Sequence, residues 1–321
     1  MRTTHLPIIA LSFVLLSACG GGASDTFHAL STSTTSLVLA ASGTTRVITV
    51  NNEGPLPAKN LRFSSTDLPT GTWVRSTCPA DLLPLRSCVL IVTPGSVPSA
   101  TPGDLAPGSG SVELAADNTT KVQVKLSVIT HGSVYQGGYV FAIDDTTPIA
   151  NGVGGKVLDL LETGPSRWYH FRSAVAGINE DSTAGPDSCD GALDGRCNTQ
   201  RIMARYRTDA RDFAAALCVD SRNGGFADWY LPATCETGYH PAVSGSGVCG
   251  SQAAPRLPDN VKSRLFDKGL GGLTGYWTST QASATPLDNA YIALFTPDIA
   301  NLVAIKQLAS FASRCARHLT P

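Results

Sequence analysis

The sequence predicts a β-rich, multidomain protein whose N-terminal part is all-β and whose C-terminal part mixes helices and strands. The chain has 321 residues, more than one compact domain usually holds, so two domains are expected. Short runs of alternating apolar and polar residues fill the first half, whereas a helical pattern occurs only in the second half. The 31 glycines and 20 prolines, with only 15% charged residues, favour an exported protein rich in turns.

The N-terminus has the pattern of an export signal. Arg2 gives a positive start, and residues 6–16 form an apolar run shorter than the roughly 20 residues that a membrane-spanning helix needs. Residues 16–19, Leu-Ser-Ala-Cys, resemble the lipobox of bacterial lipoproteins. This resemblance implies that residues 1–18 are a signal peptide and that Cys19 becomes an N-terminus carrying lipid, palmitate included. The alternative is an ordinary secretory signal with a chance cysteine.

The residues after the lipobox predict where the protein resides. Gly20 stands where an aspartate would favour retention in the inner membrane, so an outer-membrane lipoprotein is expected, on the cell-surface or the periplasmic face. The Gly- and Ser-rich residues 19–30 are expected to form a flexible tether. The membrane, bound through the N-terminal lipid, is therefore the first expected partner.

Residues 31–129 contain a series of short strand patterns. The clearest is at residues 121–128, where Val122, Val124 and Leu126 alternate with polar residues. About seven such strands within about 100 residues favour an immunoglobulin-like β-sandwich. This part has no cluster of His, Asp or Glu, so it is expected to be a spacer or binding module and not a catalytic domain.

Eight cysteines remain besides Cys19, and an even number in an oxidising compartment indicates disulfides. No Cys-x-x-Cys pair occurs, which weakens a zinc or redox interpretation. The segment between Cys78 and Cys88 has the form Cys-x-x-x-Leu-x-Pro-x-x-x-Cys and resembles a loop of bacterial immunoglobulin-like repeats. That resemblance implies a Cys78–Cys88 disulfide.

The remaining residues, 131–321, predict a mixed domain. Apolar residues at helical spacing predict a helix over residues 208–222, capped by Thr208 and ended by Gly224-Gly225. A second helix is expected over residues 258–268. The expected strands lie at residues 139–143, 275–280, 290–295 and 302–308.

Short sequence boxes in this part resemble a known family. The boxes are the strand at 132–144, Asn198-Thr199, Asp-Trp-Tyr-Leu-Pro at 228–232 with Glu236, Gly-Tyr-Trp-Thr-Ser-Thr at 275–280, and Ser-Arg-Cys-Ala-Arg at 313–317. Together they resemble the C-terminal domain family of the Legionella collagen-like adhesin. The resemblance implies a mixed α+β domain shaped like C-type lectin-like domains. It also implies an envelope or extracellular role with adhesion to glycans.

The box residues are expected to serve the structure rather than a ligand. Glu236 is expected to cap a helix or to accept from a backbone amide. Aromatic and leucine side chains are expected in the core, and the box hydroxyls are expected to bond to backbone. The residues assigned this role are Asp228, Trp229, Tyr230, Leu231, Pro232, Tyr276, Trp277, Ser279, Thr280, Arg314 and Arg317.

The chain departs from the family at one place, because Cys235 precedes Glu236 and a Gly/Ser-rich insertion holding Cys249 follows. We expect a Cys235–Cys249 disulfide to hold this insertion. Six cysteines allow several pairings, so the full assignment stays a hypothesis. The remaining expected pairs are Cys218–Cys315, which would tie the ends of the domain together, and Cys189–Cys197, which would close a local loop.

A run of arginines is the candidate ligand-binding site: Arg201, Arg205, Arg207 and Arg211. Arg201 and Arg205 lie four residues apart, so they would share one face of a helix and could bind sulfated glycans or other anions. The alternative is a solvated or salt-bridged helix, because Asp209 and Asp212 lie beside the run.

Four acidic residues that lie close together in the sequence are a candidate calcium site: Asp181, Asp187, Asp190 and Asp194. Their spacing does not follow the EF-hand pattern, and the calcium-binding boxes of sugar-binding C-type lectins are absent from the sequence. The alternative is an acidic, solvated loop. No metal or cofactor is therefore expected.

The sequence offers little to support catalysis or nucleic-acid binding. It contains no His-x-x-x-His, no Gly-x-Ser-x-Gly and no phosphate-binding loop, and its net charge is −1. The expected function is that of a non-catalytic envelope lipoprotein presenting a lectin-like adhesion module for a glycan or protein ligand. The alternative is a structural envelope component that contacts other bacterial proteins.

Overall fold

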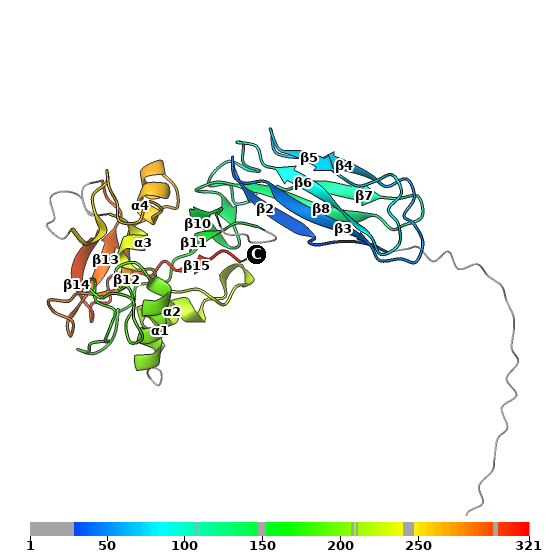
Figure 1. The fold of residues 1–321 in the computed structure, drawn as a ribbon. Helices are drawn as coiled ribbons and strands as arrows, with labels where there is room; N and C mark the ends of the chain where they lie inside the picture. The colour runs from blue at the N-terminus through cyan, green and yellow to red at the C-terminus, as the bar shows by residue number, and fades with distance from the viewer. Residues whose placement is uncertain are drawn as a thin grey trace, which may run out of the picture.

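The computed structural model describes residues 29–106, 108–146, 152–206, 209, 211–239, 247–297 and 301–320. The expected signal peptide, Cys19, most of the expected tether, Thr208 and Arg207 lie outside these residues. Figure 1 shows a strand-rich N-terminal unit, residues 29–129, whose end lies against a C-terminal unit of mixed composition. The protein is thus β-rich and built from several sheets. Within the described part, no helix combines the length and the apolar character needed to cross a bilayer.

The N-terminal unit consists of two four-stranded sheets. One has the order β1 (Leu30–Thr32), β3 (Arg46–Asn52), β6 (Ser87–Thr93) and β5 (Trp73–Ser76). The other has the order β2 (Ser36–Ala40), β8 (Val122–Ile129), β7 (Gly110–Ala115) and β4 (Arg62–Thr66). All neighbouring strands are antiparallel except β2 and β8, which pair in parallel.

Period-two patterning makes these two sheets pack face to face. Val124, Leu126 and Val128 of β8 are buried on one side of their sheet, as the alternation predicted. They share one apolar cluster with Ile48 and Leu90 of the other sheet. The core of the N-terminal unit therefore lies between the sheets, and the other side of β2 packs against the C-terminal unit.

The C-terminal unit also contains two sheets. The four-stranded sheet has the order β15 (Ala316–His318), β11 (Gly154–Asp159), β10 (Gly138–Asp144) and β9 (Val134–Tyr135). The three-stranded sheet has the order β12 (Gly275–Gln281), β13 (Asn289–Leu294) and β14 (Asn301–Ile305). The helices are α1 (Gly195–Arg205), α2 (Ala214–Asp220), α3 (Thr234–Thr237) and α4 (Val261–Arg264), with short 3₁₀ turns η1 (Asn223–Gly225), η2 (Gly247–Cys249) and η3 (Phe266–Lys268).

The helices differ from those expected from the sequence. The helix predicted over residues 208–222 is the shorter α2, which begins after the extended residue Phe213. The one predicted over residues 258–268 is α4 followed by the separate turn η3. The longest helix, α1, had no predicted bounds, because its buried side includes Asn198 and Thr199 and so gives no apolar periodicity.

The two units meet at one end of the N-terminal sheets. Val38 and Ala40 of β2 pack in the same buried cluster as Val140 and Val157 of the C-terminal unit. At the same junction, Arg46 at the start of β3 forms a 2.7 Å ion pair with Asp145. The Arg46 end of β3 therefore faces the C-terminal unit, and its Asn52 end points away from it.

All eight cysteines in the described residues form disulfides. The pairs are Cys78–Cys88, Cys189–Cys197, Cys218–Cys315 and Cys235–Cys249, the same pairs that the sequence analysis gave. The Cys218–Cys315 bond joins α2 to the segment just before β15 across 97 residues of sequence. It thus holds the C-terminal edge strand of the four-stranded sheet against the helical side of the unit.

The long Cys218–Cys315 bridge should stabilise the fold more than the short Cys189–Cys197 bridge. In the chain-entropy model, closing a loop of about 100 residues contributes about 4.7 kcal/mol, against about 3 kcal/mol for a loop of 15. Chemical denaturation of the two paired Cys→Ser variants measures this difference. Equal losses in the two variants would contradict the expected dependence on loop length.

Candidate functional site

The sequence boxes of the C-terminal unit form a buried polar framework. Arg317 forms a bidentate ion pair with Asp228, with nitrogen–oxygen distances of 2.7 and 3.2 Å. The Arg317 side chain is almost fully buried, and its guanidinium carbon lies 3.7 Å from the ring centroid of Phe226. The Asp-Trp-Tyr-Leu-Pro box and the last box are therefore bonded to each other, which is the structural role expected for them from the sequence.

Glu236 is the centre of this framework. Its side chain is 1% exposed, and its carboxylate accepts four hydrogen bonds. Lys156 Nζ donates at 2.5 Å and the Tyr230 hydroxyl at 2.9 Å to one oxygen, while the Ala233 and Gly195 amides donate at 2.8 and 3.2 Å to the other. Burial, and then the Glu236 charge, raise the pKa of the Tyr230 hydroxyl well above its ordinary value. One carboxylate thus fixes β11, the start of α1 and the turn before α3.

The remaining aromatic box residues are anchored through their polar atoms. Trp277 Nε1 donates to the Ser166 carbonyl at 2.9 Å, and Trp229 Nε1 donates to the Asn223 carbonyl at 3.1 Å. The Tyr276 hydroxyl donates to Glu162 at 2.6 Å. Buried Trp and Tyr side chains need such partners, so these contacts fix the rings in the core.

The hydroxyl and basic box residues bond mainly to backbone. Thr280 donates to the Gly191 carbonyl at 2.7 Å, and Ser279 accepts from the Asn198 amide at 3.2 Å. Arg314 donates to the Asp159 carbonyl at 2.6 Å. Leu231 is fully buried, and the Pro232 carbonyl accepts from the Ser279 backbone amide at 2.8 Å.

The arginines of the predicted site make separate local contacts in the structure. Arg201 and Arg205 both belong to α1, but Arg201 Nε already donates to the Ala176 carbonyl at 3.0 Å. Arg211 lies beyond that helix and forms an ion pair with Asp220, Nε to Oδ2 at 2.6 Å. Arg201 and Arg205 thus lie four residues apart on α1, whereas Arg211 lies in a separate segment and is paired with Asp220.

Two acidic residues of the candidate calcium site make contacts within the protein. Asp194 caps α1 by accepting from the Cys197 amide at 2.9 Å. Asp190 lies 3.3 Å from Arg256. Across the described ranges, no three His, Cys, Asp or Glu side chains come together in a way that could hold a metal ion.

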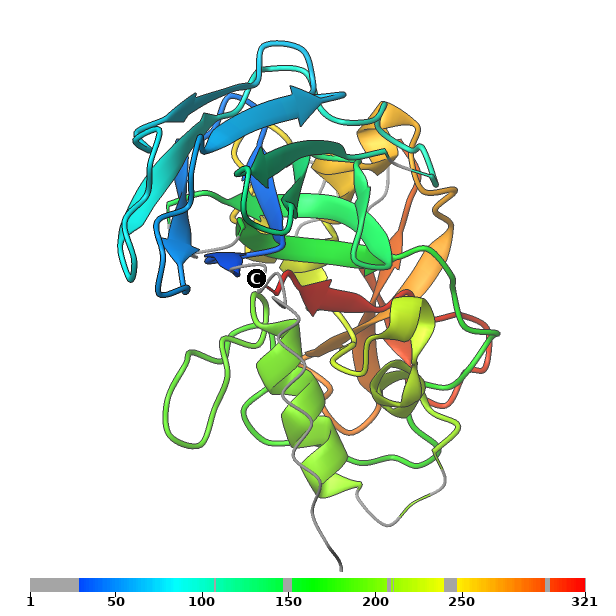
Figure 2. The ribbon, with the colours of Figure 1, turned by 90° about the vertical axis from the view of Figure 1, so that its right-hand side faces the viewer.

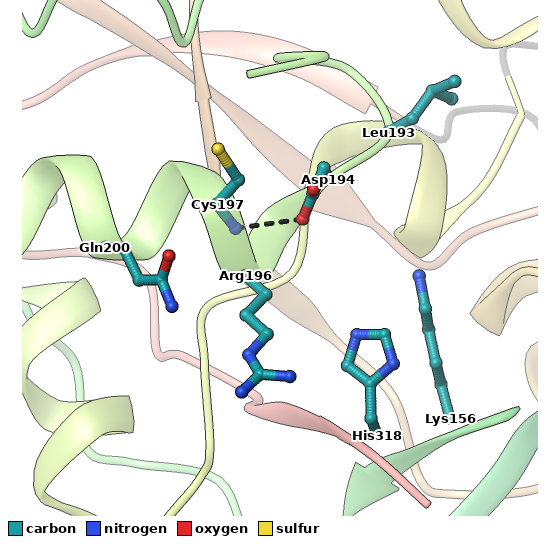
Figure 3. Close-up of a pocket in the computed structure, with 7 residues that line it drawn as sticks. All are labelled: Lys156, Leu193, Asp194, Arg196, Cys197, Gln200 and His318. Atoms are coloured by element: carbon teal, nitrogen blue, oxygen red, sulfur yellow. Dashed lines mark hydrogen bonds between the residues drawn. The ribbon is translucent and has the colours of Figure 1, made fainter. Parts of the chain in front are cut away.

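A hollow that the sequence analysis did not predict lies beside α1. Its volume is about 460 Å³, and its lining residues come from β11, the start of α1 and β15: Lys156, Leu193, Asp194, Arg196, Cys197, Gln200 and His318 (Figure 3). A second hollow of about 320 Å³ shares Arg196 and Gln200 with the first, and its other walls include Met203, Val219 and Trp229. We call the two together the α1 groove. Figure 2 shows α1, in green, below the red strand β15.

The polar groups of the α1 groove are of mixed charge. Lys156 is neutralised by Glu236, and Asp194 lies beside the start of α1, whereas the exposed Arg196 has no hydrogen bond or ion pair with any described residue. Burial, and then the Lys156 charge, lower the pKa of the His318 ring. The groove therefore offers donors and acceptors beside an apolar wall, which suits a ligand rich in hydroxyl groups.

These groove residues could not be found from the sequence because no motif joins them. Lys156, Arg196 and His318 are separated by long stretches of chain and are brought together by the pairing of β11 with β15 and by the contacts of Glu236. The sequence boxes beside the groove were the one signal that could have indicated its position, because they show which segments of the chain come together.

Comparison with known proteins does not identify the chain: no family model and no curated protein matches it. Domains 4 and 5 of the S-layer protein SbsC are 16% identical at a TM-score of 0.24, over 32% of this chain and 51% of that chain. The E. coli chaperone DraB is 12% identical at a TM-score of 0.25, over 44% and 74%. This chain thus spans about half the length of the first of these, and likenesses at this level carry no argument about its function.

The contacts of Glu236 predict that replacing its carboxylate by an amide destabilises the fold strongly. Glu236→Gln should lower the free energy of unfolding by about 3 kcal/mol, because it leaves Lys156 without its buried counter-ion and places an amide donor against other donors. Chemical denaturation measures this loss. Asp81→Asn is the matched control, because Asp81 pairs with Lys59 on the exposed surface and should change stability little. A Glu236→Gln variant as stable as the control would contradict the role given to this carboxylate.

The His318 ring should titrate below its ordinary value of 6.5. Because the folded state disfavours the charged ring, the unfolded chain takes up this proton first, and the contribution of His318 to stability is lost as the pH falls below 6.5. NMR titration measures the His318 pKa directly. Lys156→Met should raise it only in part, since burial, the larger cause, remains. A pKa at or above 6.5 in the parent protein would refute this description of the groove.

Proposed function

We propose that this protein is a non-catalytic envelope lipoprotein, anchored in the outer membrane by lipid on Cys19, which presents a C-terminal binding module. The lipobox at residues 16–19 supports the anchor. The four disulfides support an extracytoplasmic location, because such bonds persist in oxidising compartments.

The strand order supports an immunoglobulin-like N-terminal domain that acts as a spacer. Taking β1 as strand A, the first sheet has the order A-B-E-D of the immunoglobulin fold. The other sheet contains its C, F and G strands as β4, β7 and β8, with β2 added beside G. Its disulfide differs from that of antibody domains, because Cys78–Cys88 closes a local loop instead of bridging the two sheets.

The binding proposal rests on the α1 groove, where Arg196 has no hydrogen bond or ion pair with a described residue. The boxes that resemble the adhesin family make mostly internal contacts, which supports a lectin-like module in which they hold the framework. Asp228, Trp229 and Tyr230 also line the second hollow of the α1 groove. Arg196, Gln200 and Asp194 line an open hollow and offer both donors and acceptors. A glycan, with its many hydroxyl groups, is the ligand that this arrangement favours.

One observation favours the second candidate, a structural envelope component that contacts other bacterial proteins. Strand β14 is at the edge of its sheet and exposes Leu302, Val303 and Ile305. An uncharged apolar edge strand is a site where another protein can add a strand. In this alternative the β14 edge, not the α1 groove, is the contact surface.

A glycan array probed with the protein tests the first proposal. We expect binding to at least one sulfated or neutral glycan, and the double variant Arg196→Ala/Gln200→Ala should weaken it about tenfold, a loss of about 1.4 kcal/mol. Arg201→Ala/Arg205→Ala should weaken it less, because Arg201 already bonds to Ala176. Arg75→Ala in the N-terminal unit is the matched control.

The array also separates the two candidates. Binding to no glycan would reject the adhesion proposal and leave the envelope-component role. Protease treatment of intact cells should release the C-terminal unit if the protein is a surface adhesin. Protection of that unit in intact cells, with cleavage after the outer membrane is opened, would instead place it in the periplasm.

A further inference from the structure

Three exposed leucines lie together at the end of the N-terminal unit that points away from the C-terminal unit. Leu56 is 54% exposed, Leu83 is 56% exposed and Leu85 is 80% exposed. They come from two loops, one after β3 and one before β6, which are joined by the antiparallel bridge between Ala58 and Leu82. We call the three side chains the leucine tip.

The buried side chain of Asn52 holds the two loops in place. Its amide donates to the Leu56 carbonyl at 2.8 Å and to the Leu82 carbonyl at 2.9 Å, and its backbone carbonyl accepts from the Leu85 amide at 3.0 Å. Asn52 is 1% exposed, so these bonds are shielded from water. The leucine tip is therefore presented by a fixed scaffold.

Leu85 is disfavoured in water for two independent reasons. Its backbone has φ of +55°, the left-handed region in which glycine and asparagine are favoured and a branched side chain is strained. Its apolar side chain is also the most exposed of the large apolar side chains in the described residues. A residue that is costly in both respects is expected where it contacts something other than water.

The place where the chain enters the N-terminal unit indicates which surface the leucine tip contacts. The Ala29 carbonyl accepts from the Glu53 amide at 3.1 Å, so the first described residue lies at the same loop as Leu56. Cys19 is ten residues earlier, and ten residues reach at most about 36 Å in any conformation. A lipid on Cys19 therefore keeps this end of the unit close to the bilayer surface.

We infer that the leucine tip inserts into the lipid bilayer beside the anchor, an inference that rests on the proposed lipidation of Cys19. Exposed apolar side chains on a surface held at a membrane enter the boundary between headgroups and acyl chains. Arg86, the exposed neighbour of Leu85, suits the phosphate groups at that depth. The tip sets the orientation of the sandwich, with its other end and the C-terminal unit directed away from the membrane.

Site-directed fluorescence on the lipidated, full-length protein in phosphatidylethanolamine/phosphatidylglycerol vesicles tests this inference. Because the eight other cysteines are paired and Cys19 is acylated, a cysteine introduced as Leu85→Cys is the one site for an environment-sensitive label. We expect blue-shifted, brighter emission that is quenched by a lipid-borne quencher. Leu105→Cys is the matched control: Leu105 is 66% exposed, lies in the loop near the C-terminal unit, and its label should remain water-like.

A second variant separates the membrane contact from stability. Leu85→Asn should keep or raise the thermal unfolding midpoint, since asparagine tolerates the left-handed backbone. A label at Leu56→Cys should nevertheless lose most of its blue shift in the Leu85→Asn background, and should keep it in a Leu105→Asn background.

The outcomes distinguish the inference from the function on which it rests. Mass spectrometry of the N-terminal peptide reports acylation, and an unmodified Cys19 would reject the anchor and the inference together. An acylated protein whose Leu85 label stays water-like would overturn the inference alone. A label that is shielded but not quenched from the lipid would also overturn it, because the tip would then be covered by a second copy or another protein.

Discussion

The carboxylate of Glu236 is the interaction on which the C-terminal unit depends. Removing a charge from water is costly unless every lone pair finds a donor, and here four donors surround one buried side chain. Those donors belong to β11, to the start of α1, and to the Asp-Trp-Tyr-Leu-Pro box and the turn that follows it. The position of α1 relative to β11 and β15, and with it the shape of the α1 groove, follows from this one set of bonds.

The two ends of the protein have different surfaces. The leucine tip lies at the Asn52 end of β3, where the chain enters the N-terminal unit. At the other end of β3, Arg46 is paired with Asp145 and the unit packs against the C-terminal unit. The strand β3 thus marks the direction from the proposed anchor to the binding module. The spacer role proposed for the sandwich depends on this junction being a packed interface, because a loose linker would not fix the direction of the α1 groove.

The sequence predicted the parts of this structure that are governed by local patterns. The alternation in β8 predicts its buried face, and a resemblance to bacterial immunoglobulin-like repeats implies Cys78–Cys88. The other three expected pairs, which were a hypothesis among several pairings, also form. Helix α1 and the groove beside it could not be predicted, because α1 buries Asn198 and Thr199 through bonds to distant segments. Lys306 is a similar case: its buried ammonium donates to the carbonyls of Ser173 and Pro286, which no local pattern reveals.

We propose that the sequence boxes hold the framework of the C-terminal unit and that the α1 groove beside them binds the ligand. Hydrogen–deuterium exchange of the protein with and without heparin, a sulfated glycan probe, tests it most directly. We expect slower exchange at residues 193–203, 154–158 and 316–318, which border the groove. Protection confined to the β14 edge at residues 301–305, or a response at the buried Asp-Trp-Tyr-Leu-Pro box without one at α1, would contradict it.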